Sequence, residues 1–257
     1  MAYIEINDVS KVYQRDGEPF HALSHVSLEI ERGEFICLLG PSGCGKTTLL
    51  NTLAGFEHPD EGRVLIGGEA VTEPVPNRVT IFQHYGLLPW QTVEKNVMLG
   101  LLAKKVPKEE ARAIASKYID LVGLSGFEHV RPAQLSGGMQ QRVSIARGLA
   151  VQPDVLFMDE PFAALDAITR LKMQDDIHRI AEEEGVTVVF VTHDIEEAVA
   201  LADRIVVLTP NPGQVKEVVK VELGPDRLRT ADDFLAVRDH VFDVFGMKPN
   251  WNVEYVI

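Results

Sequence analysis

The stretch that most constrains the fold is GPSGCGKT, residues 40–47, which satisfies the pattern G-x-x-x-x-G-K-[ST]. It follows the apolar run FICLL, residues 35–39, and leads into TTLLNTLAGF, which has a helical pattern. Glycines at these spacings let backbone N–H groups turn inward onto phosphate oxygens, and a helix N-terminus adds a potential that favours anions. Between a buried strand and a helix, this motif predicts a P-loop nucleotide site rather than a glycine turn that happens to contain a lysine.

The loop assigns roles to individual residues. Lys46 is expected to reach the β- and γ-phosphates of ATP, and Thr47 to offer a hydroxyl to Mg²⁺. Cys44 has two interpretations: a thiol made reactive by Lys46 and the helix N-terminus, or a small residue that fills a tight loop, which we favour. The residues predicted to surround the phosphates are Gly40, Pro41, Ser42, Gly43, Cys44, Gly45, Lys46, Thr47 and Thr48.

Continuous apolar runs recur along the chain and set the fold class. VLFM (155–158), VTVVFV (186–191) and RIVVL (204–208) are typical of parallel strands buried on both faces. AYIEINDVSKVY and HALSHVSLEIERGE, near the N-terminus, alternate as half-exposed antiparallel strands do. The pattern predicts an α/β fold: a P-loop NTPase core with a mostly parallel sheet, an N-terminal antiparallel β subdomain and a helical insert.

The insert is expected at about residues 87–135. Thr92 is a candidate N-cap for one helix, and Pro107 a candidate first residue of the next. A further helix is predicted over 168–184, stopped by Gly185. Later residues read as a strand, VKEVVKVEL, and a helix, DDFLAVRDHVFDVF. We predict an ATP-binding domain at 1–235 and a C-terminal helical tail at 236–257.

Polar side chains follow three of the apolar runs, where open α/β sheets place their ligands. Asp159 can hold Mg²⁺, and Glu160 can orient or deprotonate the attacking water. His193 ends another strand, and Gln83 follows the run TIF with an amide able to touch Mg²⁺ or water. Each residue alone has a structural alternative, a surface acid for Glu160 and a core histidine for His193.

A second glycine loop, LSGGMQQR (135–142), carries no lysine. Ser136, Gly137 and Gly138 offer N–H groups, a hydroxyl and a helix N-terminus, which suit the completion of a phosphate cage rather than its anchoring. The geometry makes sense if the loop covers the γ-phosphate bound by a second, identical chain, so that two chains enclose two ATP molecules. The alternative is a turn that simply ends the helical insert.

Together these motifs resemble the ATP-binding subunits of ABC transporters, over about residues 3–215. The resemblance rests on GPSGCGKTTLL, Gln83, LSGGMQQR, LFMDEP, AALD and VTHD in this order. It implies that LSGGM binds ATP in trans, that Asp166 links the two sites and that His193 contacts the γ-phosphate. Tyr13, with Phe20 as the less favoured candidate, resembles the aromatic that stacks on adenine, although packing is the alternative for Tyr13. Met139 replaces the usual glutamine of LSGGQ, which leaves ribose-edge contacts open.

QHYGLLPWQTVEKNV, PFAALDAITR and TPNPGQV resemble the importer group for nitrate, sulfonate and taurine. This implies a peripheral subunit at the cytoplasmic face of the membrane, joined to permease subunits and indirectly to a solute-binding protein. The insert and the Gln83 loop would receive the permease, with Trp90 either docking or packing. Rival classes are an ABC exporter subunit, a soluble non-transport ABC ATPase and a nucleotide-gated scaffold. Stimulation of ATPase activity by a permease and a binding protein would separate an importer from these rivals.

Bulk properties limit the other options. The net charge of −13 argues against nucleic acid as a partner and against a basic membrane patch. The 257 residues contain no apolar run of about 18 residues, and MAYIEIND is not a signal peptide. The only cysteines are Cys37 and Cys44, which fits a reducing compartment rather than a disulfide framework.

Overall fold

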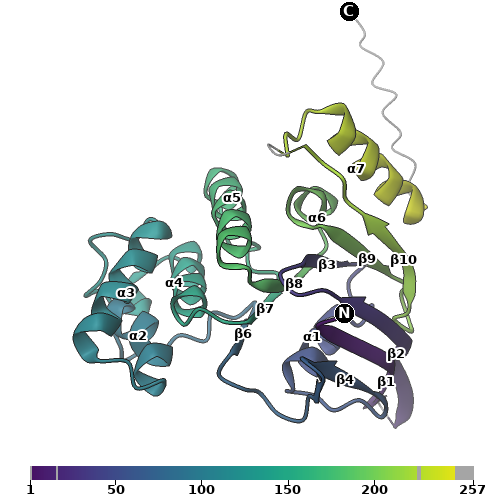
Figure 1. Cartoon of the computed structure of the whole chain (residues 1–257), viewed down its shortest axis with the longest axis horizontal. Helices are drawn as coiled ribbons and strands as arrows, with labels where there is room; N and C mark the ends of the chain where they lie inside the picture. The colour runs from purple at the N-terminus through teal and green to yellow at the C-terminus, as the bar shows by residue number, and fades with distance from the viewer. Residues whose placement is uncertain (1, 16, 225–226, 247–257) are drawn as a thin grey trace, which may run out of the picture.

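The structure is a computed structural model that describes residues 2–15, 17–224 and 227–246 (Figure 1). It confirms the predicted α/β class, with a mostly parallel sheet, a separate antiparallel sheet and a helical region. The elements in chain order are β1 (Ile4–Arg15), β2 (Glu18–Ile30), β3 (Phe35–Leu39), α1 (Lys46–Ala54), β4 (Glu61–Ile66), β5 (Glu69–Ala70), β6 (Arg78–Ile81), α2 (Val93–Ala103), α3 (Lys108–Leu121), η1 (Pro132–Gln134), α4 (Gly137–Ala150), β7 (Val155–Asp159), α5 (Ala167–Glu184), β8 (Thr187–Thr192), α6 (Ile195–Leu201), β9 (Arg204–Leu208), β10 (Val215–Lys220) and α7 (Asp232–Val244).

The larger sheet has the order β10-β9-β3-β8-β7-β6. Its strands run parallel except β10, which pairs antiparallel with β9. The P-loop strand β3 therefore lies in the interior, between β8 and β9. Because the carboxyl ends of parallel strands share one edge, Leu39, Asp159 and Thr192, the last residues of β3, β7 and β8, lie along the same edge of the sheet.

Each central strand is buried on both faces, which explains the continuous apolar runs in the sequence. In β3, Phe35, Cys37 and Leu39 face a core shared with α2 through α7. Ile36 and Leu38, between them, face a second core formed with α1 and the antiparallel sheet. Figure 1 shows α5 and α6 on one side of the large sheet and α1 with β1, β2 and β4 on the other.

The antiparallel sheet has the order β2-β1-β4-β5. β1 pairs with β2 over most of its length and with β4 between Ile4 and Ser10, so that Ile4 lies opposite Ile30 on one side and Ile66 on the other. All three side chains are buried in the second core. This sheet covers α1 and so supports the helix that begins at the P-loop.

The helical region gathers α2, α3 and α4 at the left of Figure 1. Thr92 caps α2 as predicted, since its side chain accepts a hydrogen bond from the Lys95 amide at 3.3 Å. The prediction for Pro107 was wrong by one position: α3 begins at Lys108, and Pro107 is its N-cap with a non-helical ψ of 140°. Proline satisfies both positions because neither needs an intrahelical N–H donor.

The remaining helices complete the covering layer. Gly185 ends α5 in the left-handed conformation at φ 64°, as the sequence predicts. α7 packs against α6 and begins at Asp232, as the run DDFLAVRDHVFDVF indicates. The boundary placed at 235/236 thus falls inside this helix, and residues 247–257 of the predicted tail lie outside the described residues.

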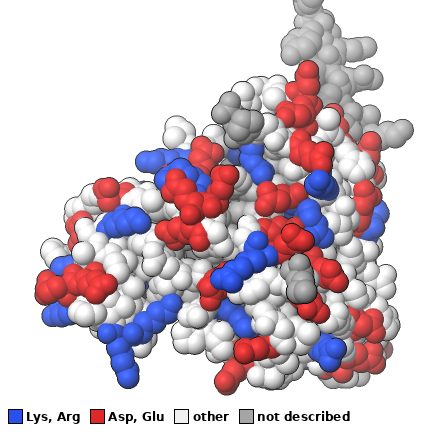
Figure 2. Space-filling model, viewed as in Figure 1, with Lys and Arg blue, Asp and Glu red and all other residues white. Residues whose placement is uncertain are grey.

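The surface reflects the acidic composition. Figure 2 shows Asp and Glu side chains over the covering helices and over the antiparallel sheet, interspersed with Lys and Arg. Among the described residues, no helix is long and apolar enough to cross a membrane.

Candidate nucleotide site

The P-loop is shaped by glycines that no other residue can replace without strain. Gly43 and Gly45 have φ angles of 80° and 91°, in the region that favours glycine. A Cβ on Gly45 would lie 2.5 Å from the Ala22 carbonyl oxygen. α1 starts at the next residue, and the first amides of a helix have no acceptor within it. The loop therefore offers backbone N–H groups and a positive helix end to an anion.

Lys46 lies inside this loop and is 6% exposed. Its ammonium group donates to the Gly40 carbonyl oxygen at 2.7 Å and to that of Pro41 at 3.0 Å. The charge is therefore held by neutral acceptors, an arrangement in which an anionic phosphate is a stronger partner. Cys44 is buried, and burial raises the pKa of its thiol although Lys46 lowers it in part. These observations support the packing interpretation of Cys44 over a reactive thiolate.

Thr47 and Asp159 meet across the site. The Thr47 hydroxyl donates to Asp159 Oδ2 at 3.0 Å, which joins the start of α1 to the end of β7. Burial raises the pKa of the Asp159 carboxyl, and the Thr47 hydrogen bond opposes this in part. A hydroxyl and one carboxylate are the oxygen donors that Mg²⁺ takes together with substrate phosphates. No cluster of three His, Cys, Asp or Glu side chains suited to a metal occurs among the described residues. The donor set fits a metal shared with a phosphate rather than an all-protein cage.

Glu160 and His193 form a pair at the same edge of the sheet. His193 Nδ1 lies 3.1 Å from Glu160 Oε1. The backbone of Glu160 is left-handed, with φ 45°, and its amide donates to the Val191 carbonyl oxygen at 3.0 Å. A non-glycine residue in this conformation is uncommon, and such outliers cluster at functional sites. The pair can orient a water molecule and exchange a proton.

Within the described part of the chain, the other residues predicted for the site have no recorded contact with Lys46, Asp159 or the Glu160–His193 pair. Gln83 is exposed and lies two positions beyond Ile81, which pairs with Met158, so it leaves β6 at the edge that carries Glu160. Tyr13 and Phe20 are cross-strand partners in the β1–β2 hairpin, with the Lys11 ammonium 5.6 Å from the Tyr13 ring centre. Their role in adenine stacking stays a prediction.

The second glycine loop belongs to a different part of the molecule, the helical region. Ser136 is the N-cap of α4, and its hydroxyl accepts a hydrogen bond from the Met139 amide at 3.3 Å. A Cβ on Gly137 would lie 2.8 Å from the Tyr85 hydroxyl, and one on Gly138 would lie 3.1 Å from the Ala164 carbonyl oxygen. The loop is thus held against the segment that follows Glu160.

Asp166 has a local structural role. It caps α5, with its side chain accepting from the Thr169 amide at 3.0 Å. This hydrogen bond holds the pKa of the carboxyl below its usual value. Aspartate is among the residues preferred at an N-cap because its side chain accepts from a free amide of the first turn. The link between two sites that the resemblance implies for Asp166 stays a prediction.

Sequence reasoning missed the aromatic residues of α7. A cavity of about 310 Å³ is lined by Gly40, Pro41, the segment 193–196, Phe242 and Phe245. The C-terminal helix therefore reaches the P-loop and the His193 loop. The helical pattern predicted α7 but gave no sign of what it packs against. Sequence reasoning also missed Glu197, a buried acid on α6 next to the His193 loop.

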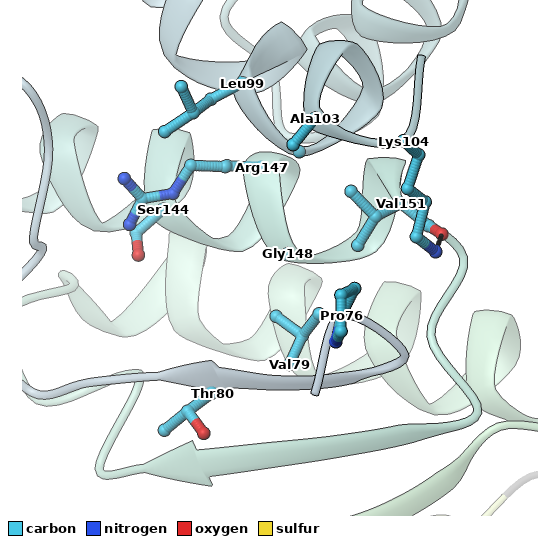
Figure 3. Close-up of a pocket in the computed structure, with 11 residues that line it drawn as sticks. Pro76, Val79, Thr80, Leu99, Ala103, Lys104, Ser144, Arg147, Gly148 and Val151 are labelled. Atoms are coloured by element: carbon cyan, nitrogen blue, oxygen red, sulfur yellow. Dashed lines mark hydrogen bonds between the residues drawn. The ribbon is translucent and has the colours of Figure 1, made fainter. Parts of the chain in front are cut away.

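A further cavity, of about 450 Å³, lies between α2, α4 and β6 (Figure 3). Figure 3 shows Leu99 and Ala103 on α2 above Arg147 and Val151, with Val79 of β6 below. Arg147 also donates to the Gly86 carbonyl oxygen at 2.7 Å and to that of Tyr85 at 3.0 Å, which fixes the loop after Gln83 to α4. Trp90, two residues before the α2 N-cap Thr92, is 66% exposed, which favours docking over packing for this side chain.

These features agree with the known proteins to which the chain is similar. Residues 23–163 match the family described as ABC transporter. The chain is 49% identical to an ABC transporter ATP-binding protein of Methanocaldococcus jannaschii, described as uncharacterized, over 94% of this chain and 90% of that protein. It is 45% identical to a bicarbonate transport ATP-binding protein of Synechocystis, over 94% and 88%, and 43% identical to a nitrate import ATP-binding protein of Synechococcus elongatus, over 89% and 85%.

Solved structures give the same result. The fold superposes on a dimeric ATP-binding cassette in a post-hydrolysis state bound to ADP and Pi, with a TM-score of 0.79 and 35% identity, covering 86% of this chain and all of that one. The structure of cbiO1 from Clostridium perfringens, described as part of the ABC transporter complex cbiONQ, gives a TM-score of 0.74 and 25% identity, over 85% of this chain and 88% of that one. The fold and site define an ATP-binding cassette. The chain belongs to the ABC transporter family as an ATP-binding subunit, and it is an ATPase.

Proposed function

We propose that this chain powers an importer of a small solute, of the nitrate, sulfonate, taurine or bicarbonate kind, through a separate permease in the membrane. The observation that carries the proposal is the Glu160–His193 pair, 3.1 Å apart, on the sheet edge that also carries the P-loop and Asp159. A scaffold that only binds nucleotide has no need of this pair. The names of two relatives, for bicarbonate transport and nitrate import, support uptake of a small anion.

In the reaction, the P-loop amides and Lys46 hold the phosphates, and Lys46 exchanges its two carbonyl partners for phosphate oxygens. Thr47 and Asp159 would hold Mg²⁺, which neutralises charge on the β- and γ-phosphates when bound. Glu160 orients the attacking water and takes its proton. His193 holds the Glu160 carboxylate in place and faces the γ-phosphate. Gln83 completes the water or metal contacts, and the loop residues from Gly40 to Thr48 act mainly by positioning.

The second glycine loop acts in a partner copy. Ser136, Gly137 and Gly138 would cover the γ-phosphate bound by the other chain, and Asp166 would lie where the two sites meet. Support comes from the exposed position of Ser136 on the helical region and from the dimeric cassette to which the chain is similar. In a two-fold dimer the same contact occurs twice, so two loops close two sites. The dimer would form with ATP and open after hydrolysis.

The permease would dock on the helical region. The cavity in Figure 3, which the exposed Leu99 lines, gives this region an apolar surface, and Trp90 is exposed shortly before α2. Arg147 joins the loop after Gln83 to α4, so a force on the surface reaches the sheet edge. We place the chain peripherally at the cytoplasmic face, where it meets a solute-binding protein only through the permease. No residue described above is expected to contact the solute or nucleic acid.

Reconstitution with a permease and a solute-binding protein tests the proposal. The measurement is ATP hydrolysis and solute uptake in proteoliposomes, with Glu160→Gln in the same permease complex as the control. We expect uptake that requires ATP on the side of this chain and stops with Glu160→Gln. Solute movement outward, or hydrolysis indifferent to the permease, would contradict an importer.

A further inference from the structure

A buried carboxylate lies beside the Glu160–His193 pair. Glu197, on α6, is 8% exposed and lines a cavity of about 120 Å³ together with Glu160, His193, Thr192 and Arg170. Burial raises the pKa of its carboxyl, opposed in part by the Thr192 hydrogen bond. Burying such a group is costly unless it is hydrogen-bonded, so its partners indicate what the residue is for.

One carboxylate oxygen fixes the loop that carries His193. The Thr192 hydroxyl donates to Glu197 Oε2 at 2.8 Å. The same hydroxyl oxygen accepts a hydrogen bond from the Asp194 amide at 3.0 Å. The Thr192 hydroxyl directs its proton to Glu197, so its oxygen lone pairs are free to accept the hydrogen bond from the Asp194 amide. Glu197 thus holds the residues on both sides of His193.

The other oxygen faces the segment that follows Glu160. Glu197 Oε1 lies 3.9 Å from Arg170 Nε, and Arg170 Nη2 donates to the Leu165 carbonyl oxygen at 3.1 Å. Leu165 and Glu160 belong to the turn between β7 and α5. A single carboxylate therefore connects the loops of both members of the pair.

The connection continues to the C-terminal segment. Glu197 Oε1 also accepts a hydrogen bond from Gln174 Nε2 at 3.0 Å, and Gln174 is 1% exposed. The Gln174 side-chain oxygen accepts in turn from Arg229, which lies between β10 and α7. The two Glu197 oxygens and the Gln174 amide have hydrogen-bond partners, and hydrogen-bonded buried groups of this kind rigidify the segments they join. Arg170 Nε has no hydrogen-bond partner among the described residues and adds an ion pair to Glu197.

We propose that Glu197 is a positioning residue for ATP hydrolysis, which sets the distance between Glu160 and His193 by holding Thr192 and Arg170 together. Through Gln174 and Arg229, the C-terminal segment joins the same network and supports the geometry of the pair. The inference rests on the proposed roles of Glu160 and His193. A positioning role predicts that removing Glu197 lowers kcat by more than it lowers the folded fraction. A purely structural role predicts equal losses.

Glu197→Ala and Thr192→Val break the same hydrogen bond from its two ends. We expect each to lower kcat about ten- to a hundredfold, as loss of a residue that orients a functional group does, with KM for ATP within about twofold. Thr192→Ser keeps the hydroxyl and is expected to restore most of kcat. Thermal unfolding and circular dichroism of each variant measure the folded fraction at the assay temperature.

The double variant tests whether the two residues act as a unit. If they do, Glu197→Ala with Thr192→Val loses no more kcat than the more damaging single change. The inference would be overturned if the kcat loss of the double variant equals the product of the two single losses, or if each kcat loss matches the unfolded fraction of that variant. Either result would show that Glu197 only stabilises the fold.

Arg229→Ala tests the C-terminal connection, and Arg238→Ala is its matched control. Arg238, on α7, pairs only with its neighbour Asp239 among the recorded contacts of the described residues. We expect Arg229→Ala to lower kcat about threefold, because one member of the network is lost while the carboxylate stays, and Arg238→Ala to leave it unchanged. Equal effects of the two changes on kcat would show that the C-terminal segment does not support the Glu160–His193 pair through Arg229.

Lys46→Ala separates this inference from the proposed function. One outcome is that the wild-type chain hydrolyses ATP, that Lys46→Ala abolishes hydrolysis, and that the Thr192 and Glu197 variants keep the wild-type kcat. In that case this inference is wrong and the proposed function stands. If the wild-type chain with its permease does not hydrolyse ATP, both are wrong.

Discussion

The two glycine loops of this chain both precede a helix, yet their surroundings differ. In the P-loop, Lys46 is buried against the Gly40 and Pro41 carbonyl oxygens, and Thr47 reaches Asp159 on a neighbouring strand. In the loop before α4, Ser136 is exposed, and its recorded hydrogen bond goes to its own helix. The first loop brings a cation, a hydroxyl and a carboxylate to one point, and the second brings a helix end with one serine hydroxyl.

This difference shows how the same local device can serve two purposes. A helix N-terminus attracts an anion weakly, at about 0.3–1 kcal/mol for a surface group. A lysine and a metal-binding carboxylate strengthen this weak attraction and make the anion site specific. The P-loop has both groups, and the Ser136 loop has neither. The Ser136 loop therefore suits completion of a site whose main binding energy is supplied elsewhere.

Lys46→Ala should have the largest effect, because it removes the positive charge that distinguishes the P-loop from the Ser136 loop. We expect ATP affinity to fall about a hundredfold, the scale of a charge-assisted hydrogen bond of roughly 3 kcal/mol, with hydrolysis abolished. Titration calorimetry measures the affinity. Lys117→Ala, an exposed lysine on α3, is the control and should bind as the wild type does. Retained affinity in Lys46→Ala would mean that the P-loop binds mainly by its backbone.

Ser136→Arg should separate binding from turnover. A bulky cation at the N-terminus of α4 blocks the loop, and we expect kcat to fall about a hundredfold, the scale for losing a transition-state donor. ATP affinity of the single chain should change by less than about twofold. Ser116→Arg, on an exposed face of α3, is the matched control. If Ser136→Arg weakens binding as much as Lys46→Ala, the loop belongs to the site of its own chain.

Asp159→Asn should stabilise the fold while impairing the site. Burial raises the folded-state pKa of this carboxyl above its unfolded value. Such a group disfavours the native state once the pH rises above the unfolded pKa, and asparagine removes the buried charge. We expect the melting temperature near pH 7 to rise by about 2–4 °C, the equivalent of about 1 kcal/mol, and magnesium-dependent hydrolysis to fall. A lower melting temperature would show that the carboxylate is a net stabilising partner of Thr47.

Gly138→Ala should have the smallest effect and tests how firmly the second loop is held. The added Cβ meets the Ala164 carbonyl oxygen at 3.1 Å, which requires a shift of a few tenths of an ångström. We expect a destabilisation of about 1 kcal/mol in chemical denaturation and a loss of kcat of about threefold. No change in either quantity would mean that the loop moves freely against the segment after Glu160.

Much of the fold could be predicted because the decisive signals are local. FICLL reads as a doubly buried strand because alternate side chains enter two cores. Thr92 and Gly185 mark helix ends through their own side chain or backbone. Pro107 failed by one position because a proline satisfies two adjacent positions at a helix start.

The parts of the site that escaped prediction depend on contacts between distant segments. Glu160 adopts φ 45°, which nothing in LFMDEP indicates. Arg229 meets Gln174 across 55 positions, and Phe245, the C-cap of α7, shares a cavity with Pro41. A helical pattern gives the apolar face of α7 but not its neighbour. The position of the Ser136 loop relative to a partner chain is likewise beyond the sequence of one chain.

The most direct test of the shared-site account is the mass of Glu160→Gln by light scattering, with and without ATP. This change should stop turnover while leaving both glycine loops intact, so closed dimers accumulate. We predict that ATP converts monomer to dimer and that adding Ser136→Arg abolishes the conversion without preventing ATP binding. A Glu160→Gln chain that binds ATP yet stays monomeric at all concentrations, or that dimerises equally well with Ser136→Arg, would contradict the account.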